Sequence, residues 1–378
     1  MKLLRLIPLA VALIFPFSES IAEDKVVLIT LDGLRWQEVY TGIDEELLDS
    51  AEFTKRQDYL RREFWRADPD QRSRALMPFL HSTIFEQGVH VGDLRADSCA
   101  ELKNGKNFSY PGYSEILTGV IDDSITSNDK VPNEAKSFME LLIDLDGEGD
   151  RYSVAAFTSW DVFPFILNVE RSGIYVNAFG ALEEVRSAEE AKIQELYFDI
   201  PQPWTTVRND AFTHRFAMEY LEREKPDVLY ISYGETDDFA HDGKYHEYIT
   251  AAHRTDRFIE DVWQRLQSMA EYRNKTTLLV TTDHGRGHGP GDGWMHHGPT
   301  EKMQQGLNSL ERFESGRDGE EAVWIAAIGP DVPSSGSIPT RDRCITSDRI
   351  ASTLLHTLGI DYSKLNSAMG EPIREFLK

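Results

Sequence analysis

The sequence predicts an α/β fold, with a mainly parallel central sheet covered by helices on both faces. Four apolar runs rich in β-branched residues have the length and composition of buried strands. Continuous apolar strands are typical of sheets that are buried on both sides. Amphipathic helical patterns alternate with the strands, as in α/β proteins. The four runs are KVVLITL from Lys25, DVLYISYG from Asp227, TTLLVTTD from Thr276 and AVWIAAIG from Ala322.

The other elements follow from local periodicity and end signals. The clearest helical patterns run from Val207 to Glu224 and from Tyr245 to Gln267. Tyr152 to Phe157 predicts a further strand. Thr346 or Ser347 would cap a last helix that closes near Gly359.

Three polar stretches interrupt the alternation: Gln37 to Arg74, Asn168 to Trp204, and Arg286 to Glu320. We interpret them as inserted loops or lids over one sheet, because no Pro/Ser-rich linker separates two halves. The sequence therefore predicts a single domain from residue 23 to residue 378.

The first 22 residues have the pattern of a secretory signal peptide. Lys2 and Arg5 precede a short apolar run, and Ser20-Ile-Ala22 offers a small-x-small cleavage site. The alternative, a membrane anchor, needs about 20 apolar residues, and the run is shorter. We expect a periplasmic or secreted protein with no membrane span after signal removal.

Charge and cysteine content limit the partners. The 64 acidic and 40 basic residues give a net charge of −24, which argues against a nucleic-acid groove or an anionic membrane as partner. An anionic substrate then requires bound metal ions that reverse the local potential. Cys99 and Cys344 either form one disulfide or remain two buried thiols. The oligomeric state does not follow from the sequence.

Carboxylates and imidazoles follow the ends of three predicted strands. Asp32 ends the first strand, Asp237 follows the second, and Asp283-His284 ends the third. Ligand-binding groups collect past the carboxyl ends of parallel strands, so these side chains are expected at one edge of the sheet.

Histidines complete a metal-ligand set. His241 lies four residues after Asp237, close enough to bind the same ion in a helical turn or a loop, and His296 and His297 precede Gly298. Aspartate with histidine suits zinc or a similar divalent ion better than calcium. The set predicts two metal ions.

Five motifs in order resemble the alkaline phosphatase superfamily, and most closely its nucleotide pyrophosphatase/phosphodiesterase-like branch. The motifs are LITLDG, FSYPGYSEILTG, ETDDFAH, TTDHGRG and HHG, and the resemblance spans the chain from Val26 to about His356. The resemblance implies that Asp32, Asp283 and His284 hold one ion, which also contacts the nucleophile. It implies that Asp237, His241 and His297 hold the other, His297 being favoured over His296 because it directly precedes glycine.

The resemblance implies a serine nucleophile two residues before Pro111, which is Ser109. Proline favours the first turn of a helix, so Ser109 is expected at or just before a helix N-terminus, where free N–H groups suit a phosphate. Ser114 would lie on that helix, buried or capping. Asn128 is the candidate that helps bind a phosphate oxygen, with Asn133 as the second choice.

Departures from related motifs narrow the reaction. The S-Y-P-G-Y stretch lacks the arginine of the sulfatase motif, so the formylglycine route of sulfate hydrolysis is not expected. A cation that would bind the extra charge of a phosphomonoester is missing from FTSWDVF, although Lys130, Arg254 or Arg286 could serve. We therefore predict a phosphodiesterase acting on a small phosphoester. The alternatives are a phosphomonoesterase, a phosphomutase, or a non-catalytic binding relative.

Overall fold

The computed structural model describes residues 24–145, 152–287, 293–298, 319–341 and 343–378; the predicted signal peptide lies outside the described residues. The strands are β1 (Lys25–Leu31), β2 (Val89–Val91), β3 (Ala100–Glu101), β4 (Val154–Thr158), β5 (Tyr175–Ala178), β6 (Val228–Tyr233), β7 (Thr276–Thr281), β8 (Ala322–Val323), β9 (Ile325–Ile328), β10 (Gly336–Ser337) and β11 (Ile345–Thr346). The α-helices are α1 (Trp36–Thr41), α2 (Glu45–Asp49), α3 (Gln57–Phe64), α4 (Pro69–Leu76), α5 (Ser109–Thr118), α6 (Phe138–Leu145), α7 (Phe163–Ile166), α8 (Val169–Ser172), α9 (Ala188–Asp199), α10 (Asp210–Glu224), α11 (Glu235–His241), α12 (Tyr245–Ser268) and α14 (Ile350–Thr357). A π-helical turn, η1 (Leu80–Phe85), and the short 3₁₀ turns η2 (Leu94–Ala96), η3 (Gly293–Met295), η4 (Ser347–Arg349), η5 (Tyr362–Lys364) and η6 (Arg374–Phe376) complete the set.

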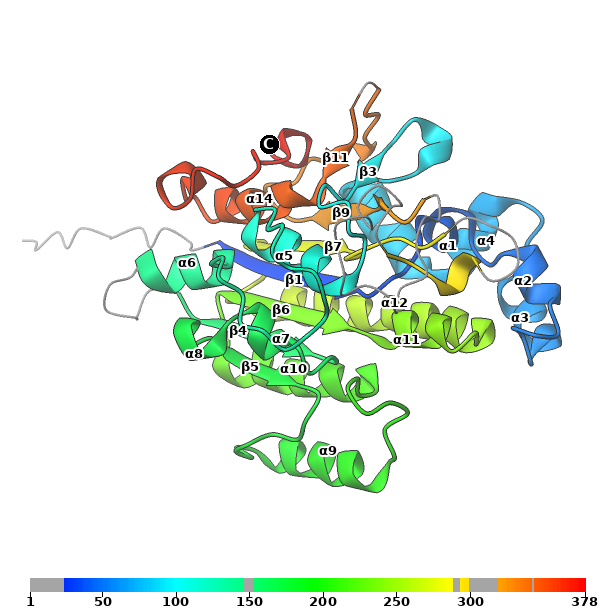
Figure 1. The fold of residues 1–378 in the computed structure, drawn as a ribbon, viewed down its shortest axis with the longest axis horizontal. Coiled ribbons are helices and arrows are strands. Elements are labelled where there is room, and N and C mark those ends of the chain that lie inside the picture. The colour runs from blue at the N-terminus through cyan, green and yellow to red at the C-terminus, as the bar shows by residue number, and fades with distance from the viewer. Residues whose placement is uncertain (1–23, 146–151, 288–292, 299–318, 342) are drawn as a thin grey trace, which may run out of the picture.

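The central sheet is mainly parallel, as predicted. Its order is β10-β2-β9-β7-β1-β6-β4-β5, and the strands β7, β1, β6, β4 and β5 all run parallel (Figure 1). β9 runs antiparallel between β7 and β2. The predicted strand from Ala322 to Gly329 divides at Trp324: β8 joins a small second sheet in the order β11-β3-β8, and β9 joins the large one.

Helices cover both faces of the large sheet, and β1 shows why. Val27, Ile29 and Leu31 belong to one buried cluster, and Val26 and Leu28 belong to another. Alternate side chains of a strand point to opposite faces, so an uninterrupted apolar strand needs an apolar layer on each side. The first cluster draws on α1 to α4, α10 and α12, and the second draws on α5, α6, α7 and α14.

Two of the three polar stretches are part of the sheet and the core, which is not expected of lids. Asn168 to Trp204 contains β5, which is the edge strand of the large sheet, together with α9. Gln37 to Arg74 spans α2, α3 and parts of α1 and α4, and it buries Leu48, Leu60 and Phe64 in the first cluster. Most of Arg286 to Glu320 lies outside the described residues.

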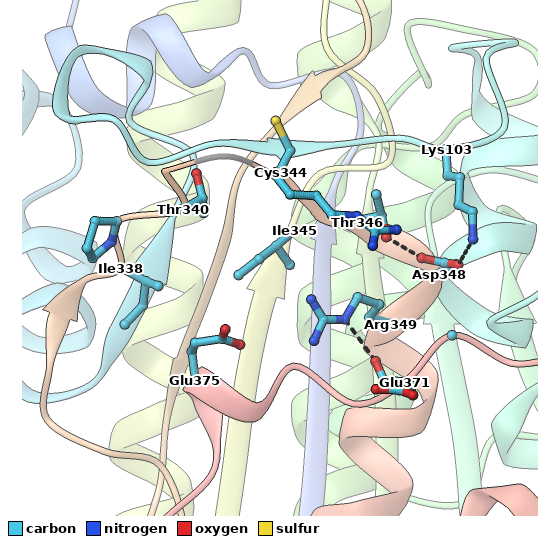
Figure 2. A pocket seen from close by; sticks show the side chains of 13 residues that line it. Lys103, Ile338, Thr340, Cys344, Ile345, Thr346, Asp348, Arg349, Glu371 and Glu375 are labelled. Carbon is cyan, nitrogen blue, oxygen red and sulfur yellow. Dashed lines mark hydrogen bonds and ion pairs between the residues drawn. The ribbon is translucent and has the colours of Figure 1, made fainter.

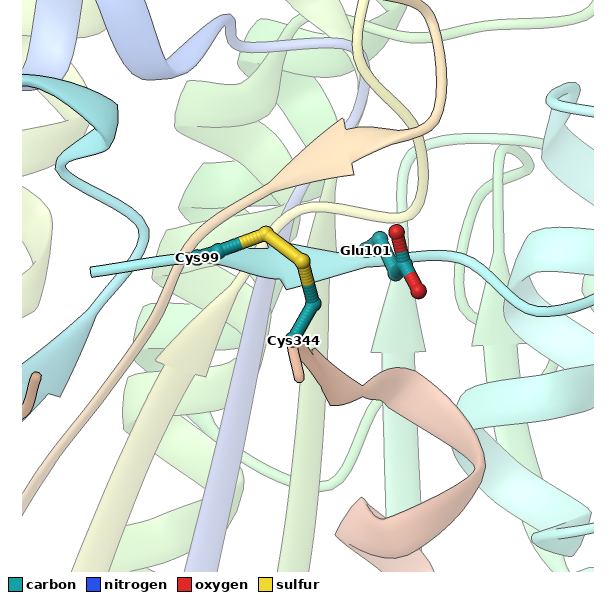
Figure 3. Close-up of side chains that lie close together, drawn as sticks. All are labelled: Cys99, Glu101 and Cys344. Atoms are coloured by element: carbon teal, nitrogen blue, oxygen red, sulfur yellow. A yellow bond between two sulfur atoms is a disulfide. The ribbon is translucent and has the colours of Figure 1, made fainter. Parts of the chain in front are cut away.

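The two cysteines form a disulfide. Cys99 and Cys344 are bonded with 4.7 Å between their Cα atoms, and they join the start of β3 to the start of β11 (Figure 3). Glu101 lies close to both cysteines, but disulfide sulfurs are not thiolate ligands. Among the described helices, none is long and apolar enough to cross a membrane.

Candidate metal centre and active site

Strand register brings the predicted ligands together at the carboxyl-terminal ends of three central strands. Leu31 of β1 pairs with Tyr233 of β6, and Thr30 pairs with Thr281 of β7. The three parallel strands therefore end together, side by side at the centre of the sheet (Figure 1). Asp32, the start of α11 and Asp283 directly follow these ends.

Asp32, Asp283 and His284 form the first group of possible ligands. His284 Nε2 lies 3.3 Å from Asp32 Oδ1 and 3.5 Å from Asp283 Oδ2. All three side chains are buried. Burial raises the pKa of Asp32, and the nearby Asp237 carboxylate raises it further. Burial and the Asp32 carboxylate raise the pKa of Asp283 well above its usual range.

Asp237, His241 and His297 lie together in the second group. Asp237 and His241 are one turn apart on α11, with 3.2 Å between Asp237 Oδ2 and His241 Nε2. His297 Nε2 lies 3.0 Å from His241 Nε2 and 3.6 Å from Asp237 Oδ1. His284 joins the two groups, because its ring stacks on that of His297 with 3.8 Å between centroids. Of the adjacent pair His296 and His297, it is His297 that lies in this group.

Backbone carbonyls orient two of the imidazoles. His284 Nδ1 donates to Gly285 O over 2.9 Å, and His297 Nδ1 donates to Asn107 O over 3.0 Å. Each hydrogen bond turns the Nε2 atom of its ring toward the carboxylates and leaves the Nε2 lone pair to bind a metal ion. Burial and the neighbouring His284 lower the pKa of His297 well below its usual value, which favours the neutral, ligating form.

The donor set fits divalent cations. Asp32 Oδ2 accepts a hydrogen bond from the Tyr113 hydroxyl, and Asp283 Oδ1 accepts one from the Gly33 N–H. The other oxygen of each carboxylate, Asp32 Oδ1 and Asp283 Oδ2, is buried and has no hydrogen-bond partner among the described residues. A buried carboxylate oxygen without a donor is costly unless a cation offsets it. Mixed carboxylate and imidazole groups suit zinc or a similar ion.

Ser109 lies beside the first group. It is the first residue of α5, and its Oγ is 3.3 Å from His284 Nε2. The helix approaches very closely: a Cβ at Gly112 would stand 2.3 Å from Asp283 O, so glycine is needed there. Ser114 is buried further along α5 and accepts a hydrogen bond from Asn133 Nδ2.

The two candidate asparagines have different surroundings. Asn128 Oδ1 accepts a hydrogen bond from the backbone N–H of Tyr110 over 2.9 Å. This bond places the Asn128 amide beside the residue that follows Ser109, and Asn128 Nδ2 takes no part in it. Asn133 is buried. Its Nδ2 donates to Ser114 Oγ, and its Oδ1 accepts from the backbone N–H of Ala135. Tyr110 N–H is thus occupied and Pro111 has none, so the start of α5 offers fewer N–H donors to a phosphate than the sequence suggested.

Each of the three candidate phosphate cations already has a carboxylate partner. Lys130 Nζ pairs with Asp161 Oδ2 over 2.6 Å. Arg254 pairs with Glu235, and Arg286 pairs with Asp237.

A family model described as type I phosphodiesterase/nucleotide pyrophosphatase matches residues 53–345. The chain belongs to this family. Its reaction class is therefore hydrolysis of phosphoric esters. No curated protein matches the chain by sequence.

Solved structures of the alkaline phosphatase superfamily share the fold of this family member. Murine ectonucleotide pyrophosphatase/phosphodiesterase 5 has 14% identity and a TM-score of 0.53, over 94% of this chain and all of that one. A 2-O GAG sulfatase has 12% identity and a TM-score of 0.56, over 93% of this chain and 73% of that one. The lipoteichoic acid synthase LtaP from Listeria monocytogenes has 12% identity and a TM-score of 0.52, over 90% and 72%.

The sequence did not identify the groups of this phosphodiesterase-family site that hold Asp32. Tyr113 Oη donates to Asp32 Oδ2 over 2.9 Å, and Thr236 Oγ1 donates to Asp32 O. The spacing of Tyr113 from Ser109, four residues on one helix, places both on one face and was the available signal.

A surface pocket lies on another part of this family member, around the disulfide and the start of α14. Lys103, Cys344, Asp348 and Arg349 line it, and Lys103 Nζ pairs with Asp348 over 2.7 Å (Figure 2). None of the predicted metal ligands is among the residues that line it.

Proposed function

We propose that the protein is an exported, metal-dependent phosphodiesterase with Ser109 as its nucleophile. One observation carries the proposal: Ser109 Oγ lies 3.3 Å from His284 Nε2, beside the buried group of Asp32, Asp283 and His284. Because His284 Nε2 would bind a metal ion and not act as a base, Ser109 needs another source of activation, and a two-metal site is one.

The residues divide between two ions, which we expect to be zinc. Asp32, Asp283 and His284 would hold one, and Asp237, His241 and His297 the other. The ions would supply activation of the serine hydroxyl and charge stabilisation at phosphorus and at the leaving oxygen.

The chain's own groups then account for the chemistry. Ser109 Oγ loses its proton to solvent and attacks phosphorus, and the bond from phosphorus to the leaving oxygen breaks, that oxygen taking a proton from solvent. Water then cleaves the phosphoseryl ester, which releases the phosphate product and regenerates the serine. Asn128, fixed by Tyr110 N–H, would donate its amide N–H to a non-bridging phosphate oxygen.

A diester is favoured over a monoester. A terminal phosphate carries an additional charge that a further cation would balance, but Lys130, Arg254 and Arg286 are each paired with a carboxylate. The family description also names phosphodiesters and nucleotide pyrophosphates.

Export rests on the signal-like residues 1–22, which are followed by the proposed single domain from residue 23 to residue 378. The disulfide supports an oxidising compartment, periplasmic or extracellular.

The test is metal analysis of the purified protein, with paired assays on bis-p-nitrophenyl phosphate and p-nitrophenyl phosphate. We expect about two divalent ions per chain, faster turnover of the diester, and loss of turnover after chelation that zinc restores. Faster monoester turnover would overturn the diester preference. No turnover of either compound with zinc present would instead favour a binding relative.

A further inference from the structure

Arg286 is a fully buried cation beside the second group of possible ligands. Its side chain has 0% exposed surface, and its Nη1 is ion-paired with Asp237 Oδ1. Its Nη2 lies 3.4 Å from His241 Nδ1. Arg286 therefore places a positive charge beside these carboxylate and imidazole groups.

The fold holds Arg286 tightly. Its Nε donates to Trp294 O and its Nη2 donates to Met295 O, both over 2.6 Å. A Cβ at Gly33 would lie 2.6 Å from Arg286 Nη1 and 2.7 Å from Asp237 Oδ1, so a larger residue at position 33 would displace the pair. These contacts direct the guanidinium at Asp237, at His241 and at the backbone carbonyls of Trp294 and Met295.

Among the described residues, no arginine or lysine is paired with the first group of ligands. Asp32 and Asp283 form ion pairs there only with His284, which is itself one of the proposed ligands. Their fixed partners, the Tyr113 hydroxyl and the Gly33 N–H, are uncharged. The two groups therefore present different net charges to an incoming cation.

We propose that Arg286 makes the two metal sites unequal: it holds Asp237 in place and weakens binding of the ion at Asp237, His241 and His297. Two physical effects act together. The guanidinium repels a divalent cation a few ångströms away, and it occupies Asp237 Oδ1, which leaves Oδ2 for the ion. The site of Asp32, Asp283 and His284 then fills first. Arg286 is a positioning residue and contacts no substrate.

This inference rests on the proposed two-ion site, and calorimetric titration of the chelator-treated wild-type protein with zinc tests it. We expect two binding steps whose dissociation constants differ by at least about tenfold. His241→Ala should remove the weaker step, and Asp283→Asn should remove the tighter one.

Substitutions at Arg286 separate the effect of its charge on zinc affinity from the effect of its packing. Arg286→Met should tighten the weaker step by about tenfold, whereas Arg286→Lys, which keeps the charge, should preserve the inequality. Arg208→Met is the matched control, because Arg208 is also buried and donates to the carbonyls of Gly180 and Asn177. A merely structural role predicts the opposite result, weaker zinc binding by Arg286→Met.

Wild-type titration can overturn the inference even if Arg286→Met does not fold. Two steps of equal affinity, or loss of the tighter step in His241→Ala, would overturn the inference and leave the hydrolase proposal standing. Absence of any zinc binding would overturn both. Two unequal zinc sites without hydrolysis would overturn only the proposed function.

Discussion

The hydroxyl of Tyr113 donates a hydrogen bond to Asp32 Oδ2 over 2.9 Å, and itself accepts from Ser232 Oγ over 3.3 Å. These two hydrogen bonds fix Oδ2 of Asp32, and the other oxygen, Oδ1, then points toward His284. Groups that orient metal ligands typically affect metal affinity or activity by about 10–100-fold.

Tyr113→Phe should therefore lower the affinity of the tighter zinc step, and the kcat/KM for bis-p-nitrophenyl phosphate, by about tenfold or more. Calorimetry and initial rates measure the two quantities. Tyr230→Phe is the control, because Tyr230 is also buried, and its hydroxyl is hydrogen-bonded to Thr30 Oγ1 over 2.9 Å and, among the described residues, to none of the predicted ligands. Unchanged zinc affinity in Tyr113→Phe would refute this role.

Asn128→Ala should lower kcat/KM by about 10–100-fold, because it removes a donor to the phosphate in a site with few other donors. Asn133→Ala should instead reduce the free energy of unfolding by about 1–3 kcal/mol, since it leaves the buried Ser114 hydroxyl without its donor. Kinetics and urea unfolding separate the two effects. The assignment of Asn128 fails if Asn133→Ala, correctly folded, loses more activity.

The buried neutral His81 should make stability depend on pH. Its Nε2 donates to Val39 O over 2.8 Å, and burial lowers its pKa from 6.5 to about 4. Between these values the unfolded chain binds a proton that the folded protein does not. Stability from this group is therefore present above pH about 6.5 and is lost as pH falls toward 4.

A shift of this size corresponds to about 3 kcal/mol. Urea unfolding from pH 7 to pH 4 should show a shallower decline for His81→Gln than for the wild type. His356→Gln, at an exposed position, is the control and should follow the wild type. Parallel curves for His81→Gln and the wild type would contradict the prediction.

Removal of the disulfide should destabilise the protein without stopping catalysis. Cys99 and Cys344 are separated by 245 positions, and closing so long a loop restricts the unfolded chain. The double variant Cys99→Ser/Cys344→Ser should lose about 2–5 kcal/mol of unfolding free energy and keep a near wild-type kcat/KM. Loss of activity in a well-folded double variant would contradict the prediction and show that the disulfide also shapes the active site.

The central strands were predictable because their residues repeat one simple pattern. The segments at Lys25, Asp227 and Thr276 are apolar throughout, and each became a central strand with a chemical group at its end. The run from Ala322 was harder: Trp324 interrupts it, and the indole N–H donates to Leu34 O over 3.0 Å, a contact set by tertiary packing. β5 was missed because an edge strand lies in a polar stretch and lacks the buried pattern.

Motif order pointed to the ligand residues of the site, but their supporting groups depend on three-dimensional contacts. Arg286 lies two residues after His284, yet its partner Asp237 is 49 positions away. Asn107 supports His297 through its backbone carbonyl, and a carbonyl has no signature in a sequence. Sequence reasoning therefore finds side chains with chemistry of their own more readily than groups that act through others.

Ser109→Ala measures the central claim most directly. The matched control is Ser114→Ala, because both serines are buried on α5 but only Ser109 approaches His284. With zinc bound and the fold intact by circular dichroism, Ser109→Ala should lose at least about 1,000-fold in kcat on bis-p-nitrophenyl phosphate, and Ser114→Ala should stay within about tenfold of the wild type. A Ser109→Ala protein that binds zinc and hydrolyses the diester at the wild-type rate would contradict the account.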